Sequence, residues 1–288
     1  MQKLQINTIK NPLLNQKLNY SGHVVNKTPK HIEYVGPFRT WEGITVFTDE
    51  CFDGDNLFIV EQITSSHKLA WIHEPRGLNP LQNSRYNNLE KNLDKFDRVM
   101  TYDAHLLSQY PHKTIFTADN AIWLEEKFNK VHPKNSHVSM IYSWKNWTEG
   151  HRLRHIIAQN AKGVDLYGTG AQREIQGKEE GLMDYKYSIV VENSWADFYF
   201  TEKILDCFAC GTIPIYWGCP NIGDFFNEKG IMKFSNLEDL SEIFKTLSQP
   251  NHYEKTLPYI EENFKKVLEY NIYEDWIYNN VYNKIIEE

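Results

Sequence analysis

Apolar and polar positions between Tyr185 and Gly218 follow the pattern of two strands joined by a helix. The run Tyr187–Val191 is apolar and β-branched, which is typical of a buried strand. From Thr201 the apolar positions recur at helical spacing, on a stripe formed by Ile204, Leu205, Phe208 and Ala209. Gly211 then suits a helix C-cap, and Thr212–Trp217 is a second apolar strand. The pattern therefore predicts a parallel βαβ unit.

The same alternation recurs on both sides of this unit. Expected strands are Ile44–Thr48, Leu57–Glu61, Lys68–His73, Arg98–Tyr102, Thr114–Thr117, Val138–Tyr142, Val164–Tyr167 and Gly230–Phe234. Expected helices are Tyr86–Phe96, Ala104–Tyr110, Thr148–Ala161, Leu237–Leu247, Tyr253–Tyr270 and Ile272–Ile286. Glycine and proline break up residues 1–40, so no element is assigned before Ile44. The alternation predicts an α/β fold with largely parallel sheets.

The segment Trp123–Ser136, which contains Pro133, is interpreted as a linker. We expect an N-terminal α/β domain at 1–135, a C-terminal α/β domain at 136–270, and a C-terminal helix at 271–288 that crosses back to the first domain. Both domains are expected to be doubly wound and Rossmann-like, and to face each other across a cleft. Ligands of such sheets bind beyond the carboxyl ends of the strands.

Composition narrows the class of protein. The chain has 288 residues and is 41% hydrophobic and 24% charged, as expected of a globular protein. Its net charge of −7 gives no reason to expect a nucleic-acid partner. The polar N-terminus contains no apolar run that would suit a signal peptide or a membrane span, so we expect a cytoplasmic protein without stable membrane insertion. Cys207 and Cys210 fall late in a helix and are expected in the core.

Lys203 is placed where a lysine is unusual. It falls in the first turn of the predicted helix, where the helix dipole and the backbone N–H groups favour negative charge. Helix starts that follow a parallel strand are common phosphate sites. Lys203 is therefore a candidate phosphate ligand. The alternative is that Lys203 pairs with Glu202 or Asp206 on a solvated helix face.

Two further charged residues fall at strand ends or helix starts. Glu74 follows the strand LAWIH, and Arg152 lies early in the helix after VSMIY. A carboxylate opposite two cations suits group transfer, because the acid accepts a proton and the cations stabilise a leaving phosphate. Alternatively, Glu74 is a surface acid and Arg152 pairs with Glu149 at helical spacing.

The segment ENSWADFYFTEK, followed by a helix and GTIPIYWG, resembles the signature of the family 10 glycosyltransferases, the α-1,3/1,4-fucosyltransferases. The bacterial members are the most similar. The resemblance is dense between Val164 and Phe234 and weaker in the segments WIHEP, FDRVMTYD and Ser143–Arg152. It does not extend to the first 40 residues.

The resemblance implies a two-domain GT-B fold and an inverting transfer of a sugar, expected to be fucose, from a GDP-sugar to a hydroxyl of a glycan or other acceptor. No obligatory metal or other cofactor is implied. The first domain would bind the acceptor and the second the nucleotide sugar. By motif, Arg152 and Lys203 match residues that hold the donor diphosphate, and Tyr199 and Glu202 match residues that contact the donor. Glu192 and Asn193 belong to the same loop and are expected to shape it and to be part of the donor-binding site.

Glu74 matches the glutamate that is proposed as general base in the family. The bacterial enzymes have GEN at this point, whereas this chain has His73-Glu74-Pro75. His73 is therefore the second candidate base, and Glu74 is preferred.

Two alternatives remain. Asp53-Gly54-Asp55 resembles the DxD motif of metal-dependent transferases, but here the apolar strand follows the acids instead of preceding them, and Asp-Gly is a turn signal. The other alternative is a protein that binds a nucleotide sugar on the same scaffold without catalysis. A binding protein has no need of a base, so the presence of Glu74 argues for an enzyme.

Overall fold

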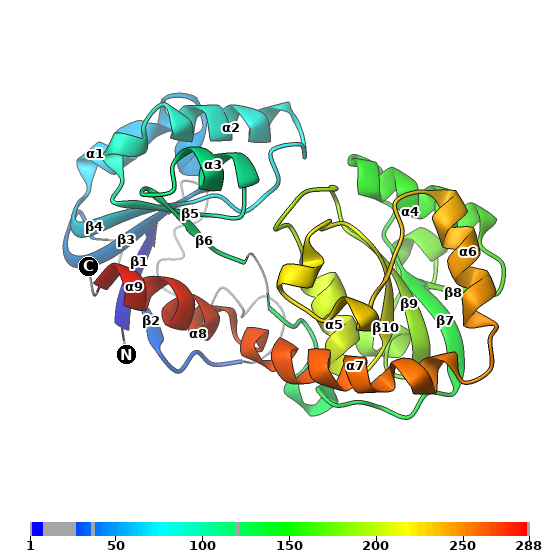
Figure 1. Cartoon of the computed structure of the whole chain (residues 1–288). Helices are drawn as coiled ribbons and strands as arrows, with labels where there is room; N and C mark the ends of the chain where they lie inside the picture. Colours follow the sequence, from blue (N-terminus) through cyan, green and yellow to red (C-terminus); the bar gives the residue numbers. More distant parts are fainter. Residues whose placement is uncertain (1, 8–26, 36–37, 119–120, 287–288) are drawn as a thin grey trace. The chain divides into compact units, whose positions relative to one another are not determined.

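The computed structural model describes residues 2–7, 27–35, 38–118 and 121–286. The chain forms two compact units (Figure 1). The first unit consists of Met1–Asp119 together with Ile272–Glu288, and the second of Asn120–Asn271. The C-terminal segment therefore belongs to the same unit as the N-terminal part of the chain.

The first unit is built on a sheet of six parallel strands in the order β2-β1-β3-β4-β5-β6. The strands are β1 (Gln2–Asn7), β2 (Ile32–Val35), β3 (Thr40–Thr48), β4 (Thr64–Trp71), β5 (Arg98–Thr101) and β6 (Thr114–Phe116). Two of these strands, β1 and β2, lie within residues 1–40, where the pattern assigned nothing. Residues 8–26 and 36–37 of that segment lie outside the described part.

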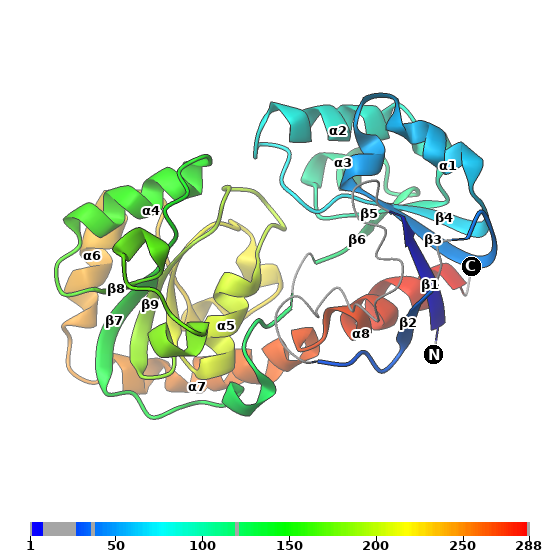
Figure 2. The same cartoon turned by 180° about the vertical axis from the view of Figure 1, so that it is seen from behind.

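Helices cover both faces of this sheet. Figures 1 and 2 show α1 (Phe58–Gln62), α2 (Pro80–Glu90) and α3 (Ala104–Gln109) on one face and α8 (Tyr273–Ile277) and α9 (Asn283–Ile286) on the other. At the end of β4, successive side chains point to opposite faces of the sheet. Ala70 and Ile72 belong to the apolar cluster under the first three helices, whereas the ring of Trp71 lies 5.2 Å from that of Tyr273.

One expected strand is helical. The segment Leu57–Glu61 was predicted as a strand, but the chain forms a 3-10 turn over Gly54–Leu57 that runs into α1. Leu57 and Val60, three residues apart, are buried, whereas Phe58 is 52% exposed. This burial period is helical, and a run of four apolar residues followed by a glutamate is too short to distinguish the two periods by sequence.

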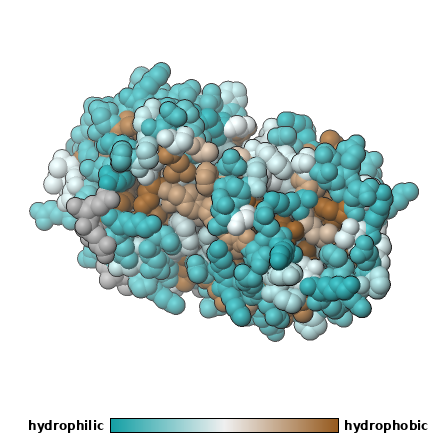
Figure 3. Space-filling model, in the orientation of Figure 1, coloured by the Kyte–Doolittle hydropathy of each residue, from teal (hydrophilic) through white to brown (hydrophobic). Residues whose placement is uncertain are grey.

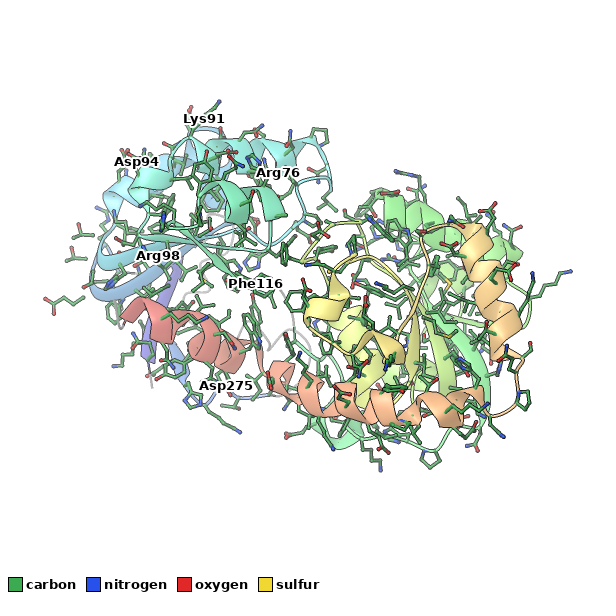
Figure 4. The ribbon with its side chains drawn as sticks, in the orientation of Figure 1. Arg76, Lys91, Asp94, Arg98, Phe116 and Asp275 are labelled. Carbon is green, nitrogen blue, oxygen red and sulfur yellow. The ribbon has the colours of Figure 1, made fainter. Side chains whose placement is uncertain are left out.

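The C-terminal segment packs on the first unit through α8. Trp276 of α8 meets Phe116 of β6 edge to face, with ring centroids 6.2 Å apart. Asp275 accepts hydrogen bonds from the backbone N–H groups of Lys30 and His31, at 2.8 and 3.2 Å. Figure 4 labels Phe116 and Asp275. The segment predicted as one helix from Ile272 to Ile286 consists of α8, a π-helical turn and α9.

The second unit is built on a sheet of five parallel strands in the order β11-β10-β9-β7-β8. The strands are β7 (Ser136–Ile141), β8 (Asp165–Tyr167), β9 (Tyr185–Val191), β10 (Ile213–Trp217) and β11 (Met232–Lys233). The helices are α4 (Glu149–Asn160), α5 (Glu202–Cys210), α6 (Leu237–Leu247) and α7 (His252–Val267). The predicted α/β class with parallel sheets is confirmed for both units.

The predicted βαβ unit is β9–α5–β10. In the parallel pairing of the two strands Ile189 lies opposite Ile215, and β10 is buried throughout. The side chain of Thr201 caps the start of α5, and Gly211 ends the helix in the left-handed conformation with φ of 71°. The crossovers β7–α4–β8 and β9–α5–β10 run in opposite directions along the sheet. The right-handed rule therefore puts α4 and α5 on opposite faces, with both N-termini at the carboxyl edge of the sheet.

The segment interpreted as a linker is bonded to the second unit. The N–H of Ile122 donates to the carbonyl of Tyr270 at 3.0 Å, and the N–H of His132 donates to the carbonyl of Cys210 at 3.2 Å. Cys207 and Cys210 are fully buried, as predicted, and burial raises the pKa of each thiol.

The surface in Figure 3 is mainly hydrophilic, with smaller apolar areas. Within the described residues, no helix combines the length and the apolar character that crossing a membrane requires.

Candidate functional site

Glu192 closes the loop between β9 and α5 onto the helix start. Its carboxylate is fully buried. One oxygen accepts from the N–H of Thr201 at 2.9 Å and the other from its hydroxyl at 2.7 Å. The Thr201 hydroxyl oxygen in turn accepts from the N–H of Lys203. Glu192 therefore determines where the first turn of α5 begins.

Lys203 lies against this arrangement. Its ammonium group is 2.9 Å from the Thr201 hydroxyl, 3.4 Å from a Glu192 oxygen and 3.3 Å from a Glu202 oxygen. About a quarter of the side chain, 26%, is exposed. The pairing with Glu202 named in the alternative interpretation is present, but the side chain is mostly buried instead of lying on a solvated face. Asp206, the other acid named there, contacts Lys178.

Glu202 is shared between two lysines. One of its oxygens lies 3.0 Å from the Lys178 ammonium as well as 3.3 Å from that of Lys203. Burial opposes ionisation of Glu202, but the two positive charges outweigh it and lower its pKa to about 2. The Glu202 side chain is 8% exposed.

The start of α4 touches the same loop. The N–H of Gly150 donates to the carbonyl of Asn193 at 3.2 Å, and a Cβ at Gly150 would lie 1.7 Å from the Glu192 carbonyl oxygen. Only glycine permits this approach. It brings the α4 start, which carries Arg152, against the loop that carries Glu192 and Asn193. Arg152 itself is exposed and donates to the carbonyl of Trp147 at 3.3 Å.

The α4 start is held by a reciprocal cap. The hydroxyl of Thr148 accepts from the N–H of His151 at 3.1 Å, and Nδ1 of His151 accepts from the N–H of Thr148 at 3.3 Å. The cap requires a neutral imidazole with its proton on Nε2. Burial, followed by the charges of Arg154, Lys145 and Lys203, lowers the pKa of His151 to about 4, which keeps it neutral.

Arg154 is a site residue that the sequence analysis missed. It is 6% exposed, and its Nε donates to the carbonyl of Val191, the last residue of β9, at 2.9 Å. Its Nη2 donates to the same carbonyl and, at 3.0 Å, to the side-chain oxygen of Asn193. A signal was available, because Gly150, Arg154 and Ile157 follow the buried stripe of α4.

Tyr199 is 3% exposed and lies in the turn before α5. The preceding residue, Phe198, has φ of 63°, a conformation uncommon for a residue with a side chain. Its N–H donates to the side-chain oxygen of Asn221 at 2.8 Å. The loop therefore has one defined conformation in which Tyr199 is packed inward.

Glu74 and His73 lie in the first unit, just beyond the carboxyl end of β4. His73 is 6% exposed, its ring lies 3.8 Å from that of Trp71, and its N–H donates to Asp49 at 3.1 Å. Glu74 is exposed, but its carbonyl accepts from Gln82 and from the hydroxyl of Tyr86, at 3.0 and 3.1 Å. Glu74 is thus an exposed residue on an anchored backbone.

Arg76 anchors the same segment and is labelled in Figure 4. Its guanidinium makes two hydrogen bonds to Asp103, at 3.1 and 3.2 Å, and lies 4.4 Å from the ring centre of Tyr86. The segment around Glu74 is therefore held by the bonds of the Glu74 carbonyl and by those of the Arg76 guanidinium.

Asp53, proposed above as half of a DxD motif, is held by an arginine. Nε and Nη2 of Arg85 donate to its two carboxylate oxygens at 2.6 and 2.9 Å. Asp55 is exposed on the following 3-10 turn. Asp53 would have to give up this bidentate pair before it could bind a cation.

The sequence is similar to known fucosyltransferases. Residues 131–283 match the model of glycosyltransferase family 10 (fucosyltransferase), C-terminal part. The chain is 37% identical over 76 residues to the α-(1,3)-fucosyltransferase FucT of Helicobacter pylori, covering 25% of this chain and 16% of that protein. It is 25% identical over 208 residues to GDP-fucose protein O-fucosyltransferase 3 of Xenopus laevis, covering 64% of this chain and 43% of that protein. The chain thus spans less than half the length of either relative.

Solved structures extend the likeness to the whole fold. An α1,3-fucosyltransferase with GDP superposes with a TM-score of 0.58 at 17% identity, covering 95% of this chain and 92% of that one. Sucrose-phosphate synthase from Thermosynechococcus elongatus superposes with a TM-score of 0.60 at 10% identity, covering 85% and 74%. At these identities the likeness shows the fold, which is GT-B. Since the family model covers more than half of the sequence, including the whole β9–α5–β10 unit, the chain belongs to glycosyltransferase family 10, the fucosyltransferase family.

Proposed function

We propose that the chain transfers fucose from GDP-fucose to a hydroxyl of a glycan or similar acceptor, with inversion at the anomeric carbon. The observation that supports this most is the start of α5. There a fully buried glutamate, a capping threonine and a partly exposed lysine lie within 3.4 Å of one another at the carboxyl edge of a parallel sheet. Family membership supplies the reaction class.

The donor diphosphate is proposed to bind between the starts of α4 and α5. Both helix starts favour anions, and each carries a basic side chain in its first turns, Arg152 and Lys203. Gly150 keeps the start of α4 against the loop that leads into α5, through the Asn193 carbonyl. When the bond to the diphosphate breaks, these two cations stabilise the charge that develops on the leaving GDP.

The neighbouring loop residues divide into two groups. Glu192, with both oxygens engaged by Thr201, shapes the loop. Asn193, Tyr199 and Glu202 are proposed to contact the nucleoside and sugar of the donor. Each is held in one orientation by packing or by a charged partner, Arg154 in the case of Asn193 and Lys178 in the case of Glu202.

Glu74 is proposed as the general base. Glu74 is an exposed residue on a fixed backbone, whereas His73 is buried beside Trp71 and Asp49. Glu74 takes the proton of the acceptor hydroxyl as the oxygen attacks the anomeric carbon. The bond from that carbon to the diphosphate oxygen breaks on the opposite face, and its electron pair leaves with GDP.

Two cations on the leaving group and the commitment of Asp53 to Arg85 support a reaction that needs no added metal. The test is to measure GDP release from GDP-fucose by the purified chain, with and without glycan acceptors and with and without EDTA. Acceptor-dependent turnover that persists in EDTA is the expected result. Turnover that EDTA abolishes would favour the metal-dependent alternative at Asp53 and Asp55. Tight GDP-fucose binding without turnover on any acceptor would favour the binding protein.

A further inference from the structure

Lys178 connects two acids of α5 from outside the helix. It lies in a 3-10 turn, Lys178–Gly181, in the connection between β8 and β9. Its ammonium group is 3.0 Å from Glu202 and 2.9 Å from Asp206, which are successive positions on one helix face. It also lies 4.4 Å from the ring centre of Trp123. Every one of these contacts is within the second unit.

Asp206 is held from a second side. Its other oxygen accepts from the backbone N–H of Trp123 at 2.7 Å, and the side chain is 1% exposed. Burial raises the pKa of Asp206, and the Lys178 charge opposes that effect. A buried carboxylate in such a place depends on its cationic partner, since removing one member of a buried pair leaves an uncompensated charge.

Glu202 makes the connection to the donor site. The same carboxylate oxygen contacts both Lys178 and Lys203, so the two ammonium groups share one negative charge. Around the start of α5, Glu192, Glu202 and Asp206 are balanced by Arg154, Lys178 and Lys203. Without Lys178 there would be three acids against two bases, and Lys203 would be the nearest cation to Glu202.

We propose that Lys178 is a positioning residue of the donor site, which neutralises Asp206 and holds Glu202 so that the Lys203 ammonium remains available to the diphosphate of the nucleotide. This rests on the proposed function for the identity of the ligand. Lys178 acts through Glu202 and Lys203, and its effect is therefore specific to the charged part of the ligand.

The experiment compares the binding of GDP and of guanosine by calorimetry in four variants. Lys178→Met keeps an unbranched side chain of similar length and removes the charge. It should weaken GDP binding on the order of tenfold, about 1.4 kcal/mol, and guanosine binding much less. Lys178→Arg should restore GDP binding because it restores the charge.

Asp206→Asn keeps a side-chain oxygen that can accept the hydrogen bond from the Trp123 N–H. It removes the second of the two negative charges that Lys178 contacts. It should leave GDP binding equal to or tighter than that of the unaltered chain. The double variant Lys178→Met with Asp206→Asn has balanced charges again and should recover most of the lost GDP affinity. Thermal unfolding of each variant confirms that it is folded.

Equal losses of GDP and guanosine binding in Lys178→Met, or no recovery in the double variant, would assign Lys178 to structure alone and overturn the proposal. A chain that binds no GDP at all would instead refute the proposed function. In that event the positioning role of Lys178 is tested by the rate at which an acylating reagent modifies Lys203, followed by mass spectrometry. Lys178→Met should slow acylation several-fold because Lys203 is then drawn to Glu202, and an unchanged rate would contradict it.

Discussion

Gly150 and Glu192 lie in van der Waals contact through their backbones, at a separation that leaves no room for a side chain. A Cβ added to Gly150 would lie 1.7 Å from the Glu192 carbonyl oxygen. This contact joins the start of α4 to the end of β9, and it is the reason why residues distant in the sequence can contribute to one site. It also gives the first prediction.

Gly150→Ala should separate α4 from the loop after β9. The clash is with backbone, so the cost in unfolding free energy should reach or exceed the roughly 1–3 kcal/mol typical of overpacking. GDP affinity should fall at the same time, because Arg152 moves with α4. Urea denaturation and calorimetry measure the two effects. Gly77→Ala is the matched control, since a Cβ there meets nothing within 4 Å. A Gly150→Ala protein of normal stability would refute the contact.

Thr201→Val should be strongly destabilising. It removes the hydroxyl that donates to Glu192 and accepts from the backbone N–H and the ammonium group of Lys203. One oxygen of the buried Glu192 carboxylate thereby loses its hydroxyl donor. The expected loss is about 2–4 kcal/mol of unfolding free energy, from a buried acceptor and a lost cap together. Thr201→Ser keeps the hydroxyl and should lose much less. Equal losses in the two variants would show that the methyl group matters more than the hydrogen bonds.

His151 should make stability depend on pH in the acid range. Its pKa is about 4 in the folded chain and 6.5 when unperturbed, so the unfolded chain binds more protons between these values. Unfolding free energy should therefore fall as pH drops from 6.5 to 4, by up to about 3 kcal/mol. His151→Gln should lose this dependence, and the difference between the two urea curves isolates it. Parallel pH profiles would disprove the assignment.

Glu74→Gln tests the general base. Turnover should fall by at least about two orders of magnitude, the usual contribution of a general base, while GDP binding is unchanged. The amide is nearly isosteric and leaves the backbone bonds to Gln82 and Tyr86 in place. Glu42→Gln, at another exposed glutamate of the first unit, is the control. Normal turnover in Glu74→Gln would show that Glu74 is not the base, and His73 would become the candidate.

Lys203→Ala tests the phosphate ligand. Removal of the ammonium group should weaken GDP binding by about tenfold or more, in line with a charge-assisted contact worth about 1.5–3 kcal/mol. The loss should shrink at high salt if the interaction is partly exposed, as its 26% exposure suggests. Lys245→Ala, on the exposed face of α6, provides the comparison. Unaltered GDP affinity would show that Lys203 only pairs with its acidic neighbours and does not bind the phosphate.

Much of the second unit was predictable from local pattern. The strand at Tyr187–Val191, the start of the helical pattern at Thr201 and the helix end at Gly211 all depend on residues within one turn or one strand of each other. The short run Leu57–Glu61 shows the limit, because five residues fit either a strand or a helix and only packing decides.

The candidate site was predicted in part. Glu192, Glu202 and Lys203 were named from a motif and from their position near a helix start, and the structure places them together. Arg154 and Lys178, which contact them or their loop, were not named. Each of these two acts on residues at least 24 positions away, Val191 and Asn193 for Arg154 and Glu202 and Asp206 for Lys178. A charged residue is usually exposed, and no local pattern reveals which distant acid or carbonyl it will meet.

The sequence alone therefore determined the alternation of strands and helices, the parallel α/β class and the family, since these depend on periodicity, caps and a contiguous motif. Only the tertiary structure decided which charges are buried and with which partner, because burial and pairing arise when strands β7, β9 and β10 become neighbours. That is why Lys203 could be named as a candidate phosphate ligand from its position in a helix, whereas the balance of acids and bases around it became visible only in the folded chain.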